Sequence, residues 1–393
     1  MIGLNLNTLN QLLGPTGASA LALAAETGPT DGEFLHALSI LRKQFPVELA
    51  RAAVETVVLR RKARIKFSRA SEMFFLREAL EVSSGEVISR YRAERFAKYD
   101  CVGDFGCGIG GDAIGLASAA RTVVAVDSDT VRLRLAEENL KVYGHTGNFI
   151  RADLLTDPLP LVPAAFADPG RRAEGKRYLA LGDYSPPPGE LLARLPKEFP
   201  IGFKLAPGAS WEDLALYPGE VEFISVDGEL KECALWLGEL RTTARRASLL
   251  GSDGTRHTLE AETPQERRDQ VEIGKVLYDP EAAVNRAGLV PNLAEILDAA
   301  PIDAVVQLLT AETHRETPFA IAYRVDAVLP LDARKISAWL RAHDIGRITA
   351  VKRGSLADSD ALQAKWKLTG PKHRFVLFTR AASQQVAVIA ERV

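Results

Sequence analysis

The stretch that decides the fold reads Cys101-Val-Gly-Asp-Phe-Gly-Cys-Gly-Ile-Gly-Gly-Asp112. Its first five residues are mostly apolar and predict a buried strand, whereas the residues after it have the pattern of a helix. The glycines between them let the backbone turn tightly and approach a ligand without a side-chain clash. The stretch therefore predicts a strand, a ligand-binding loop and a helix in direct succession.

The alternation of strand and helix continues beyond this stretch. Helical patterns occupy residues 112–120 and 130–143. Short apolar runs predict further buried strands at residues 122–126, 148–151, 164–167 and 200–205. Strands that alternate with helices over short links predict an α/β fold with a doubly wound parallel sheet.

The regions on either side have different patterns. Residues 1–98 have helical periodicity without strand-like alternation and predict an N-terminal helical domain. Residues 99–246 form the predicted core. In residues 247–318, a connecting region, the alternation fades, and a polar stretch predicts a loop before a helix at 279–287. Residues 319–393 predict a small α/β module, with strands at 320–328 and 375–378 and a helix at 332–342.

Composition is ordinary for a globular protein, but the basic residues are unevenly placed. The chain has 393 residues, 47% hydrophobic and 25% charged, with a net charge of −2, which excludes a uniformly cationic protein. Residues 60–98 carry eleven Lys and Arg against five Asp and Glu, and residues 341–393 carry ten against four. These stretches predict two basic faces for a polyanionic partner, with ordinary solvated faces as the alternative.

Cysteine usage and hydropathy bear on the compartment. The three cysteines form no pair with metal-ligand spacing, so no structural metal is expected and a reducing compartment is favoured. No apolar run approaches the roughly 18 residues that span a membrane. The apolar patch at residues 18–25 follows no basic residue, so a signal peptide is not expected. A cytoplasmic location without membrane contact is the resulting prediction.

Carboxylates follow three successive predicted strands beside the glycine loop. Asp104 lies two residues before the first glycine, where a dinucleotide site usually has an apolar residue. Asp127 ends the second strand and is placed for ribose hydroxyls. Asp153 ends the third and is expected to accept from an adenine amino group, with turn capping as the alternative. An acid at Asp104 fits the cationic amino group of S-adenosylmethionine (SAM), so the set favours SAM over a dinucleotide.

The helix that follows the loop can also face the carboxylate of such a ligand with its N-terminus. Gly106, Gly108 and Gly111 match the dinucleotide pattern GxGxxG, so an NAD-linked oxidoreductase is an alternative. The Asp227-Gly228 turn argues against it, because it predicts an antiparallel hairpin where a dehydrogenase would continue with parallel crossovers. The predicted cofactor residues are Asp104, Gly106, Gly108, Gly110, Asp112, Asp127 and Asp153.

Asp168-Pro-Gly-Arg-Arg172 follows the fourth predicted strand, at the sheet edge where reacting groups gather. Asp168 is expected to orient a nucleophilic amine by accepting its N–H, and Pro169 fixes the turn; an ordinary strand-ending turn is the alternative. Catalysis would then rest on alignment and proximity. Arg171 and Arg172 are predicted to hold a phosphate backbone, with an exposed solvated loop as the alternative.

With these residues in view, the chain resembles class I SAM-dependent methyltransferases with a C-terminal THUMP-like domain, related to trimethylguanosine-synthase-like RNA methyltransferases. The segments that carry this resemblance are residues 74–78, 83–95, 104–112, 127, 168–172, 183–187, 204–208, 226–230 and 351–354. The resemblance implies a Rossmann-like core that binds SAM. By analogy with THUMP domains it implies an RNA substrate, of the tRNA or rRNA class, held in part by Lys352 and Arg353.

One position departs from the family pattern. Base N-methyltransferases usually have a proline and an aromatic residue where this chain has Gly170 and Arg171. Stacking on the target base would then need Arg171, Tyr184 or Trp211. N-methylation of a guanine or adenine in RNA is the first interpretation. The alternatives are a SAM-dependent methyltransferase that acts on protein or a small molecule, and a SAM- and RNA-binding protein without catalytic activity.

Overall fold

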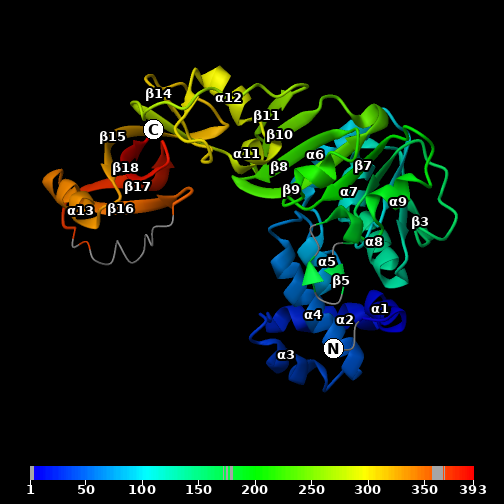
Figure 1. Ribbon diagram of the computed structural model, residues 1–393. Helices are drawn as coiled ribbons and strands as arrows, with labels where there is room; N and C mark the ends of the chain where they lie inside the picture. Colours follow the sequence, from blue (N-terminus) through cyan, green and yellow to red (C-terminus); the bar gives the residue numbers. More distant parts are fainter. Residues whose placement is uncertain (1–3, 171, 174–175, 178–179, 356–365, 367) are drawn as a thin grey trace. The chain divides into compact units, whose positions relative to one another are not determined.

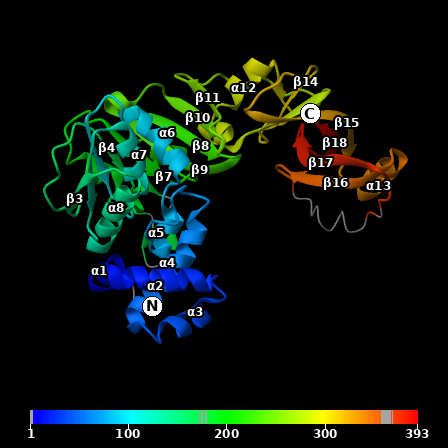
Figure 2. The same ribbon diagram turned by 180° about the vertical axis from the view of Figure 1, so that it is seen from behind.

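The computed structural model of the protein describes residues 4–170, 172–173, 176–177, 180–355, 366 and 368–393 (Figures 1 and 2). The chain divides into two units. Unit 1 comprises Met1–Glu220 and Glu232–Thr242, and unit 2 comprises Val221–Lys231 and Thr243–Val393. Within the described residues, no helix has both the length and the apolar character needed to cross a membrane.

Unit 1 begins with a helical region, as predicted for residues 1–98. Its helices are α1 (Leu6–Leu13), α2 (Pro15–Thr27), α3 (Phe34–Leu41), α4 (Val47–Ala63), α5 (Arg77–Val82), α6 (Glu86–Ala93) and η1 (Glu94–Phe96). Asn5 caps α1 by accepting the Thr8 N–H at 2.9 Å. Helices α1 to α4 pack together near the N-terminus around buried residues such as Leu41, Leu49 and Val54 (Figure 1).

A Rossmann-like sheet follows the helices in unit 1. Its strands are β1 (Cys101–Phe105), β2 (Thr122–Asp127), β3 (Gly147–Arg151), β4 (Ala165–Ala167), β7 (Ile201–Leu205) and β9 (Glu229–Leu237). They lie in the order β9-β7-β4-β1-β2-β3. All neighbouring pairs are parallel except β7 and β9, which are antiparallel. This order confirms the predicted doubly wound parallel sheet, with β9 as the antiparallel strand beside β7.

Further short elements connect these strands. They are α7 (Gly111–Ala119), α8 (Thr130–Val142), β5 (Arg172–Ala173), β6 (Lys176–Arg177), η2 (Leu181–Asp183), α9 (Pro188–Leu192), α10 (Trp211–Leu214) and η3 (Gly238–Leu240). Three large rings fill one layer of the core between α6 and the sheet. Phe96, Phe166 and Trp236 lie with ring centroids 5.9 to 6.4 Å apart and are almost fully buried. Mutual burial of such large rings stabilises the sheet and fixes the end of the helical region on it.

The hairpin predicted from Asp227-Gly228 is present, between β8 (Glu220–Val226) and β9. Both turn residues have positive φ, 50° and 77°, which Asp and Gly tolerate in a tight hairpin. In unit 2, β10 (Arg245–Leu250) runs parallel to β8, and β11 (Arg256–Ala261) is antiparallel to β10. The loop predicted for the polar stretch was wrong at β11, because its exposed edge position accommodates polar side chains.

A second sheet forms most of unit 2. Its strands are β12 (Val276–Pro280), β13 (Ala300–Pro301), β14 (Leu309–Ala311), β15 (Ala320–Pro330), β16 (Ile345–Lys352), β17 (Lys372–Ala381) and β18 (Gln384–Arg392). They lie in the order β13-β14-β12-β15-β18-β17-β16. Three of these strands come from the predicted connecting region, so a division at residue 319 runs through one sheet. The helix predicted at 279–287 begins only at Ala282, because Asp279 and Pro280 end β12.

Three helices accompany this second sheet: α11 (Ala282–Ala287), α12 (Val290–Leu297) and α13 (Ala333–Ala342). Helix α13 begins after Asp332, which accepts the N–H groups of Arg334 and Lys335, as a capping aspartate does. Its Ile336 and Leu340 pack with Val376 and Phe378 on one face of the sheet. That face is therefore closed by α13.

Helices α6 and α7 of unit 1 approach each other at two glycines. A Cβ at Gly115 would lie 2.4 Å from the backbone carbonyl of Ser89, and one at Gly111 would lie 3.1 Å from the Ser84 carbonyl oxygen. Only glycine allows the two helices to lie this close. The close approach carries α6 and the residues before it onto the N-terminal end of α7, beside the glycine loop.

Gly115→Ala is expected to destabilise the protein by about 1–3 kcal/mol, because its methyl group would overlap the α6 backbone. Chemical denaturation should show a lower midpoint with an unchanged slope. Gly182→Ala is the matched control, since a Cβ there meets nothing within 4 Å. Equal stability of Gly115→Ala and the control would contradict the close packing of α6 on α7.

Candidate functional site

The glycine loop between β1 and α7 has a backbone that other residues rarely adopt. Gly106, Gly108 and Gly110 have φ values of 82°, 53° and 85°. A Cβ at Gly106 would lie 2.8 Å from the carbonyl oxygen of Asp168, and one at Gly110 would lie 3.1 Å from Ala136. The glycines thus let the loop pass between the end of β4 and helix α8. The three predicted glycines lie together at the carboxyl ends of the parallel strands.

Asp127, at the end of β2, holds this loop from one side. Its Oδ2 accepts the N–H of Gly108 at 2.9 Å, and its Oδ1 accepts the N–H of Asp129 at 2.9 Å. Each carboxylate oxygen can accept more than one hydrogen bond, so acceptor capacity remains. The position at the strand end and this capacity are compatible with the predicted contact to ribose hydroxyls.

Arg92 of α6 is a buried cation shared by two carboxylates. Its Nη1 donates to Glu232 of β9 at 2.6 Å, and its Nη2 donates to Asp112 of α7 and to the Ser84 hydroxyl. Its guanidinium also lies over the Phe166 ring, 4.4 Å from the centroid. Buried charges need such pairing, because an isolated one costs several kcal/mol. Asp112, predicted as a cofactor residue, therefore already has a partner within the protein.

Asp104 is the exception to this pairing. Its side chain has 0% exposure, and neither carboxylate oxygen has a hydrogen-bond partner among the described residues. Burial raises the pKa of Asp104 well above its usual value; the nearby charges of Asp112, Asp168 and Asp127 add to this effect, and Arg92 opposes it. A fully buried acceptor without a donor is unfavourable unless a ligand supplies one.

Asp168 follows β4 and is held by Lys204 of β7. The Lys204 Nζ donates to Asp168 Oδ2 at 2.7 Å and to the backbone carbonyl of Val82 at 2.9 Å. Lys204 is buried, whereas Asp168 keeps 20% of its side chain exposed. Among the described residues no group donates to Oδ1, so this oxygen can accept an N–H from outside. Pro169, beside it, is buried.

The helical region forms part of this site. Asn139 of α8 is fully buried, and its side-chain amide bonds both backbone groups of Phe74 and the carbonyl oxygen of Ile109 in the glycine loop. Ser84, ahead of α6, contacts Asp112 and Arg92 and does not cap its own helix. These contacts tie residues 74–84 to the loop, so the N-terminal region supplies one wall of the site.

Five buried polar residues of the site were not predicted: Ser84, Arg92, Asn139, Lys204 and Glu232. Only one pattern in the sequence indicates any of them. Glu232 lies in a strand whose following residues are all apolar, and a charged residue at such a place needs a buried partner. Its partner Arg92 is 140 residues away in sequence, so local patterns do not identify the pair.

Some predicted residues have other contacts or lie outside the description. Asp153 is exposed, and its Oδ1 accepts the N–H of Leu155 at 2.8 Å, which is the turn-capping alternative. Arg171 lies outside the described residues. Arg172 begins β5, but its side chain is not described. Tyr184 is buried, and its hydroxyl accepts the Ala206 N–H, so its ring is not open for stacking on a base.

The two RNA contacts predicted in unit 2 differ from each other. Lys352 is exposed at the end of β16. Arg353 is engaged by Asp279, with its Nε 2.9 Å from Oδ1 and its Nη2 2.9 Å from Oδ2. A bidentate pair of this kind is among the stronger charged contacts in proteins. Of these two residues, Lys352 is the one whose side chain has no ion-pair or hydrogen-bond partner within the described ranges.

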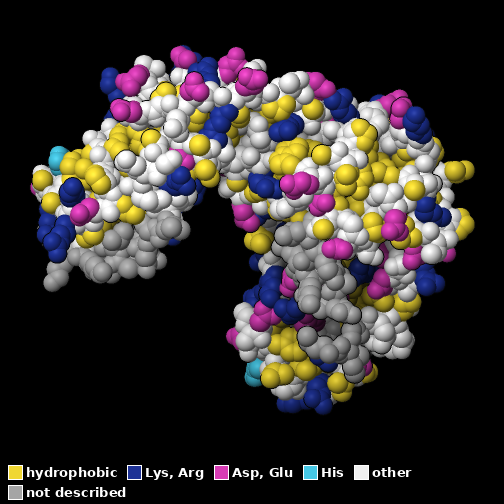
Figure 3. All heavy atoms as spheres, viewed as in Figure 1, with side chains coloured by type: hydrophobic (Ala, Val, Ile, Leu, Met, Phe, Trp, Pro, Cys, Tyr) yellow, Lys and Arg dark blue, Asp and Glu magenta, His cyan; other side chains and the backbone are white. Residues whose placement is uncertain are grey.

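Most basic side chains of residues 60–98 have partners within the chain itself, several of them at the surface. Arg60, Arg61 and Lys66 donate to backbone carbonyls. Lys62, Arg69, Arg77, Arg90, Arg92, Arg95 and Lys98 pair with acids. Arg64 is the one member of the stretch without such a contact among the described residues. On the face drawn in Figure 3, Lys and Arg side chains are interspersed with Asp and Glu.

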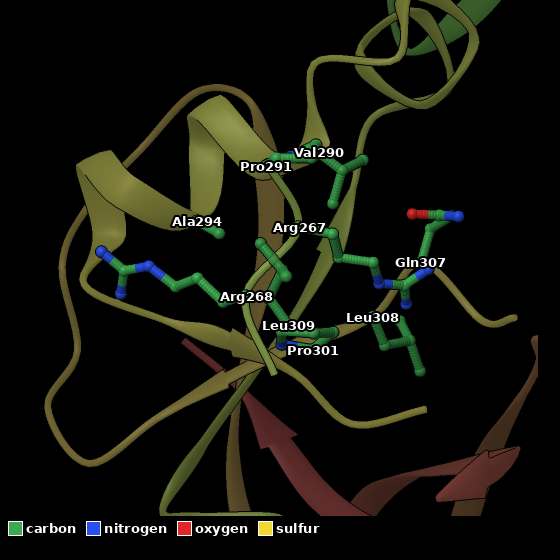
Figure 4. Close-up of a pocket in the computed structure, with 9 residues that line it drawn as sticks. All are labelled: Arg267, Arg268, Val290, Pro291, Ala294, Pro301, Gln307, Leu308 and Leu309. Carbon is green, nitrogen blue, oxygen red and sulfur yellow. The ribbon is translucent and has the colours of Figure 1, made fainter. Parts of the chain in front are cut away.

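A hollow in unit 2 is lined by Arg267, Arg268, Val290, Pro291, Ala294, Pro301, Gln307, Leu308 and Leu309 (Figure 4). Both arginines of this hollow donate hydrogen bonds to backbone carbonyl groups. Arg267 donates to the carbonyl oxygen of Ala304 at 2.6 Å, and Arg268 donates to that of Ala299 at 3.1 Å. In Figure 4 the Arg268 side chain extends away from Gln307. This hollow therefore presents no charged group reserved for a ligand.

The charges of the unit 1 site favour a cationic ligand. Five carboxylates gather near the carboxyl ends of the parallel strands, Asp104, Asp112, Asp127, Asp168 and Glu232, together with two cations, Arg92 and Lys204. The cations pair with three of these carboxylates and Asp127 accepts backbone N–H groups, whereas Asp104 has no partner among the described residues. A ligand with an ammonium or sulfonium group would satisfy it. Among the described residues, no group of three or more His, Cys, Asp or Glu side chains is arranged to hold a metal ion.

Comparisons with known proteins agree with this chemistry. Residues 99–156 match the family model described as RNA cap guanine-N2 methyltransferase, residues 320–392 match the one described as THUMP domain-like, and residues 5–63 match a domain of unknown function. A Mycobacterium tuberculosis protein, named as an uncharacterized S-adenosylmethionine-dependent methyltransferase, is 32% identical over 353 residues, 86% of this chain and 95% of that protein. A protein described in the same way from a second strain of this organism matches with the same identity and coverage.

A solved structure has the same fold. A Porphyromonas gingivalis W83 protein, which is named as a methyltransferase, superposes with a TM-score of 0.74. The match covers 95% of this chain and 98% of that one, at 20% sequence identity. At this identity the likeness supports the fold alone, and the family rests on the mycobacterial relative.

Asp104→Asn is expected to stabilise the ligand-free protein at high pH. Because the pKa of Asp104 is raised by folding, its contribution to stability is present at low pH and is lost as the pH rises through the raised value. At pH 8 the free energy of unfolding of the variant should exceed that of the wild type by about 1.4 kcal/mol for each unit by which folding raises the pKa of Asp104. The difference should be smaller at pH 5. Thermal unfolding at both pH values measures it, with Asp153→Asn as an exposed control. A lower melting temperature for Asp104→Asn at pH 8 would contradict the unpaired carboxylate.

Proposed function

Since this chain belongs to the S-adenosylmethionine-dependent methyltransferases, we propose that it methylates a nitrogen of a base in RNA. The observation that carries the proposal is the state of Asp168. Its carboxylate is fixed on one side by Lys204, and its other oxygen, at the end of β4 beside the glycine loop, has no donor in the part of the chain that the structure describes. An acceptor that donates an N–H fits such an oxygen.

SAM supplies a methyl group on a sulfonium, which makes it strongly electrophilic. The proposed cofactor residues surround the glycine loop. Asp104 would meet the ammonium group, Gly106, Gly108 and Gly110 would let the backbone approach, and Asp127 would accept from the ribose. Asp112 acts through Arg92 and anchors the helix that follows the loop. Asp153 stays a prediction for the adenine amino group, beside its observed turn contact.

The chain's own residues would align the acceptor. An exocyclic amine that donates one N–H to Asp168 Oδ1 has its lone pair directed away from the carboxylate. Lys204 keeps the carboxylate from turning, because its Nζ is itself held by the carbonyl oxygen of Val82. Pro169 fixes the turn that carries Asp168. Alignment of this kind can supply a large part of the rate enhancement without a strong general base.

RNA is favoured as the acceptor by the two matched domain descriptions and by the exposed cations of unit 2. The relatives' names give no acceptor, so the choice of RNA rests on the RNA cap guanine-N2 methyltransferase match and the THUMP domain-like match. Arg171, Arg172 and Lys352 remain the proposed contacts to phosphate, whereas Arg353 is engaged by Asp279.

A protein or small-molecule acceptor is the second candidate. It is favoured by the internal use of the basic residues at 60–98, which leaves that stretch little charge for a phosphate backbone. The two candidates share the cofactor site and the role of Asp168. They differ only in what donates the N–H.

The direct test is methyl transfer from labelled SAM to extracted RNA by the purified protein. We expect label in RNA, and nucleoside analysis should find it on a ring or exocyclic nitrogen of guanine or adenine. Label in a protein or small-molecule fraction, with none in RNA, would replace RNA by the second candidate. Absence of transfer to every fraction, with SAM bound, would favour a binding protein without catalytic activity.

Asp168→Asn is expected to lower kcat about a hundredfold while SAM affinity stays within about twofold. The amide would keep its oxygen on Lys204 and turn its NH2 group toward the acceptor, where a donor would meet a donor. Turnover and calorimetric binding of SAM should be measured on the same preparation. Glu190→Gln, an exposed change on α9, is the control. A parallel loss of turnover and SAM binding would make Asp168 a cofactor or folding residue instead.

A further inference from the structure

Asn139 of α8 holds two separate segments of unit 1 with one side chain. It is fully buried, and its Nδ2 donates to the carbonyl oxygen of Ile109 at 2.9 Å and to that of Phe74 at 2.9 Å. Its Oδ1 accepts the N–H of Phe74 at 2.8 Å. Both amide hydrogens are therefore used, and Phe74 is bound through its N–H and its carbonyl group, as a neighbouring strand would bind it.

The Ile109 end of this contact lies in the glycine loop. Gly110, the next residue, passes so close to α8 that a Cβ there would lie 3.1 Å from the Cα of Ala136. Ala136 and Asn139 are three residues apart and therefore lie on the same face of α8. One face of α8 thus holds the loop by packing and by a hydrogen bond. A ligand that orders the loop would also order the carbonyl group that Asn139 holds.

The Phe74 end lies in the segment that leads into α5 and α6. Residues 73–76 form neither helix nor strand, so their backbone groups need partners from elsewhere in the protein. Asn139 supplies a partner for both backbone groups of Phe74. Farther along the same segment, the Val82 carbonyl oxygen accepts from Lys204 of the site. The side chain of Asn139 therefore links the glycine loop to one wall of the site.

From these contacts we propose that Asn139 is a positioning residue that couples SAM binding to the docking of residues 74–84 on the glycine loop. SAM that packs on the loop fixes the Ile109 carbonyl group, and Asn139 transmits this order to Phe74. Because coupling between two equilibria is reciprocal, the docked segment also favours the loop conformation that binds SAM. The inference rests on the proposed function for the placement of SAM at the glycine loop and is independent of the methyl acceptor.

A coupling role differs from a purely structural role in what happens to SAM affinity. Removal of an amide that only stabilises the fold lowers the free energy of unfolding and leaves the SAM affinity of the folded protein unchanged. Removal of a coupling residue lowers the fraction of molecules in the binding-competent state, so the apparent dissociation constant of SAM rises by the same factor. The partners of Asn139 are 65 and 30 residues away in sequence, so its contacts join separate segments and do not serve its own helix.

The test is hydrogen exchange of the full-length protein with and without saturating SAM. In the wild type, SAM should slow exchange about tenfold or more both in peptides that cover residues 106–114 and in peptides that cover residues 74–84. The N–H of Phe74 is the direct reporter, because it donates to Asn139. In Asn139→Ala, SAM should protect the loop alone. Calorimetry should show SAM binding to this variant weakened about tenfold, the effect of one hydrogen bond of ordinary strength.

Asn148→Ala removes an exposed side chain of the same kind from β3 and should change neither quantity. Thermal unfolding must show that Asn139→Ala is folded. Asn139→Asp is the second variant: it keeps the size and the acceptor for the Phe74 N–H, but it cannot donate to both carbonyl groups and should also lose the protection of residues 74–84.

Three outcomes would overturn the proposal: no SAM-dependent protection of residues 74–84 in the wild type, the same protection in Asn139→Ala, or unchanged SAM affinity in that variant. If SAM protects residues 106–114 in each of these cases, the coupling is wrong and the proposed cofactor site stands. If SAM binds the wild type without protecting residues 106–114, the proposed placement of SAM fails, and the coupling fails with it.

Discussion

The site of unit 1 depends on how one buried cation is shared. Arg92 reaches from α6 to Asp112 at the start of α7 and to Glu232 on β9, so it joins the helical region, the glycine loop and the antiparallel strand. Arg92 and Lys204 pair with other carboxylates, so Asp104 is left as a fully buried carboxylate with no donor among the residues that the structure describes. Such a group is tolerated if it stays protonated or if a ligand supplies positive charge. The protein is thereby prepared for a cationic cofactor before the cofactor arrives.

The same contacts explain why the helical region belongs to the enzyme. Gly111 and Gly115 let α6 lie against α7, and that approach brings Ser84 and Arg92 within reach of Asp112. Lys204 connects the carboxylate of Asp168 to the end of α5 through the Val82 carbonyl oxygen. Residues before β1 therefore brace both the glycine loop and the carboxylate that we propose to hold the acceptor. A change in these residues is therefore expected to alter methyl transfer as well as stability.

Local patterns in the sequence were sufficient for most of the core. Strand β1, the hairpin at Asp227-Gly228 and helix α13 follow from apolar runs, turn chemistry and capping, all of which act over a few residues. The buried network was not predictable in this way, because Arg92 and Glu232 are 140 residues apart and only folding brings them together. Strands β12 to β14 were missed for a related reason: they are short and gain stability only by pairing with β15 or with each other. Arg353 was predicted to contact RNA, but its partner Asp279 is likewise remote in sequence.

The most direct test of this account is the number of protons released when SAM binds. Titration calorimetry in buffers of different ionisation enthalpy, repeated between pH 5 and pH 8, measures it. If the cofactor's positive charge meets Asp104, binding should favour the ionised carboxylate, so the wild-type protein should release protons over part of this range. Asp104→Asn should bind SAM more weakly and should lack this release. The same proton release from both proteins, or none from the wild type at any pH in this range, would contradict the central role of Asp104.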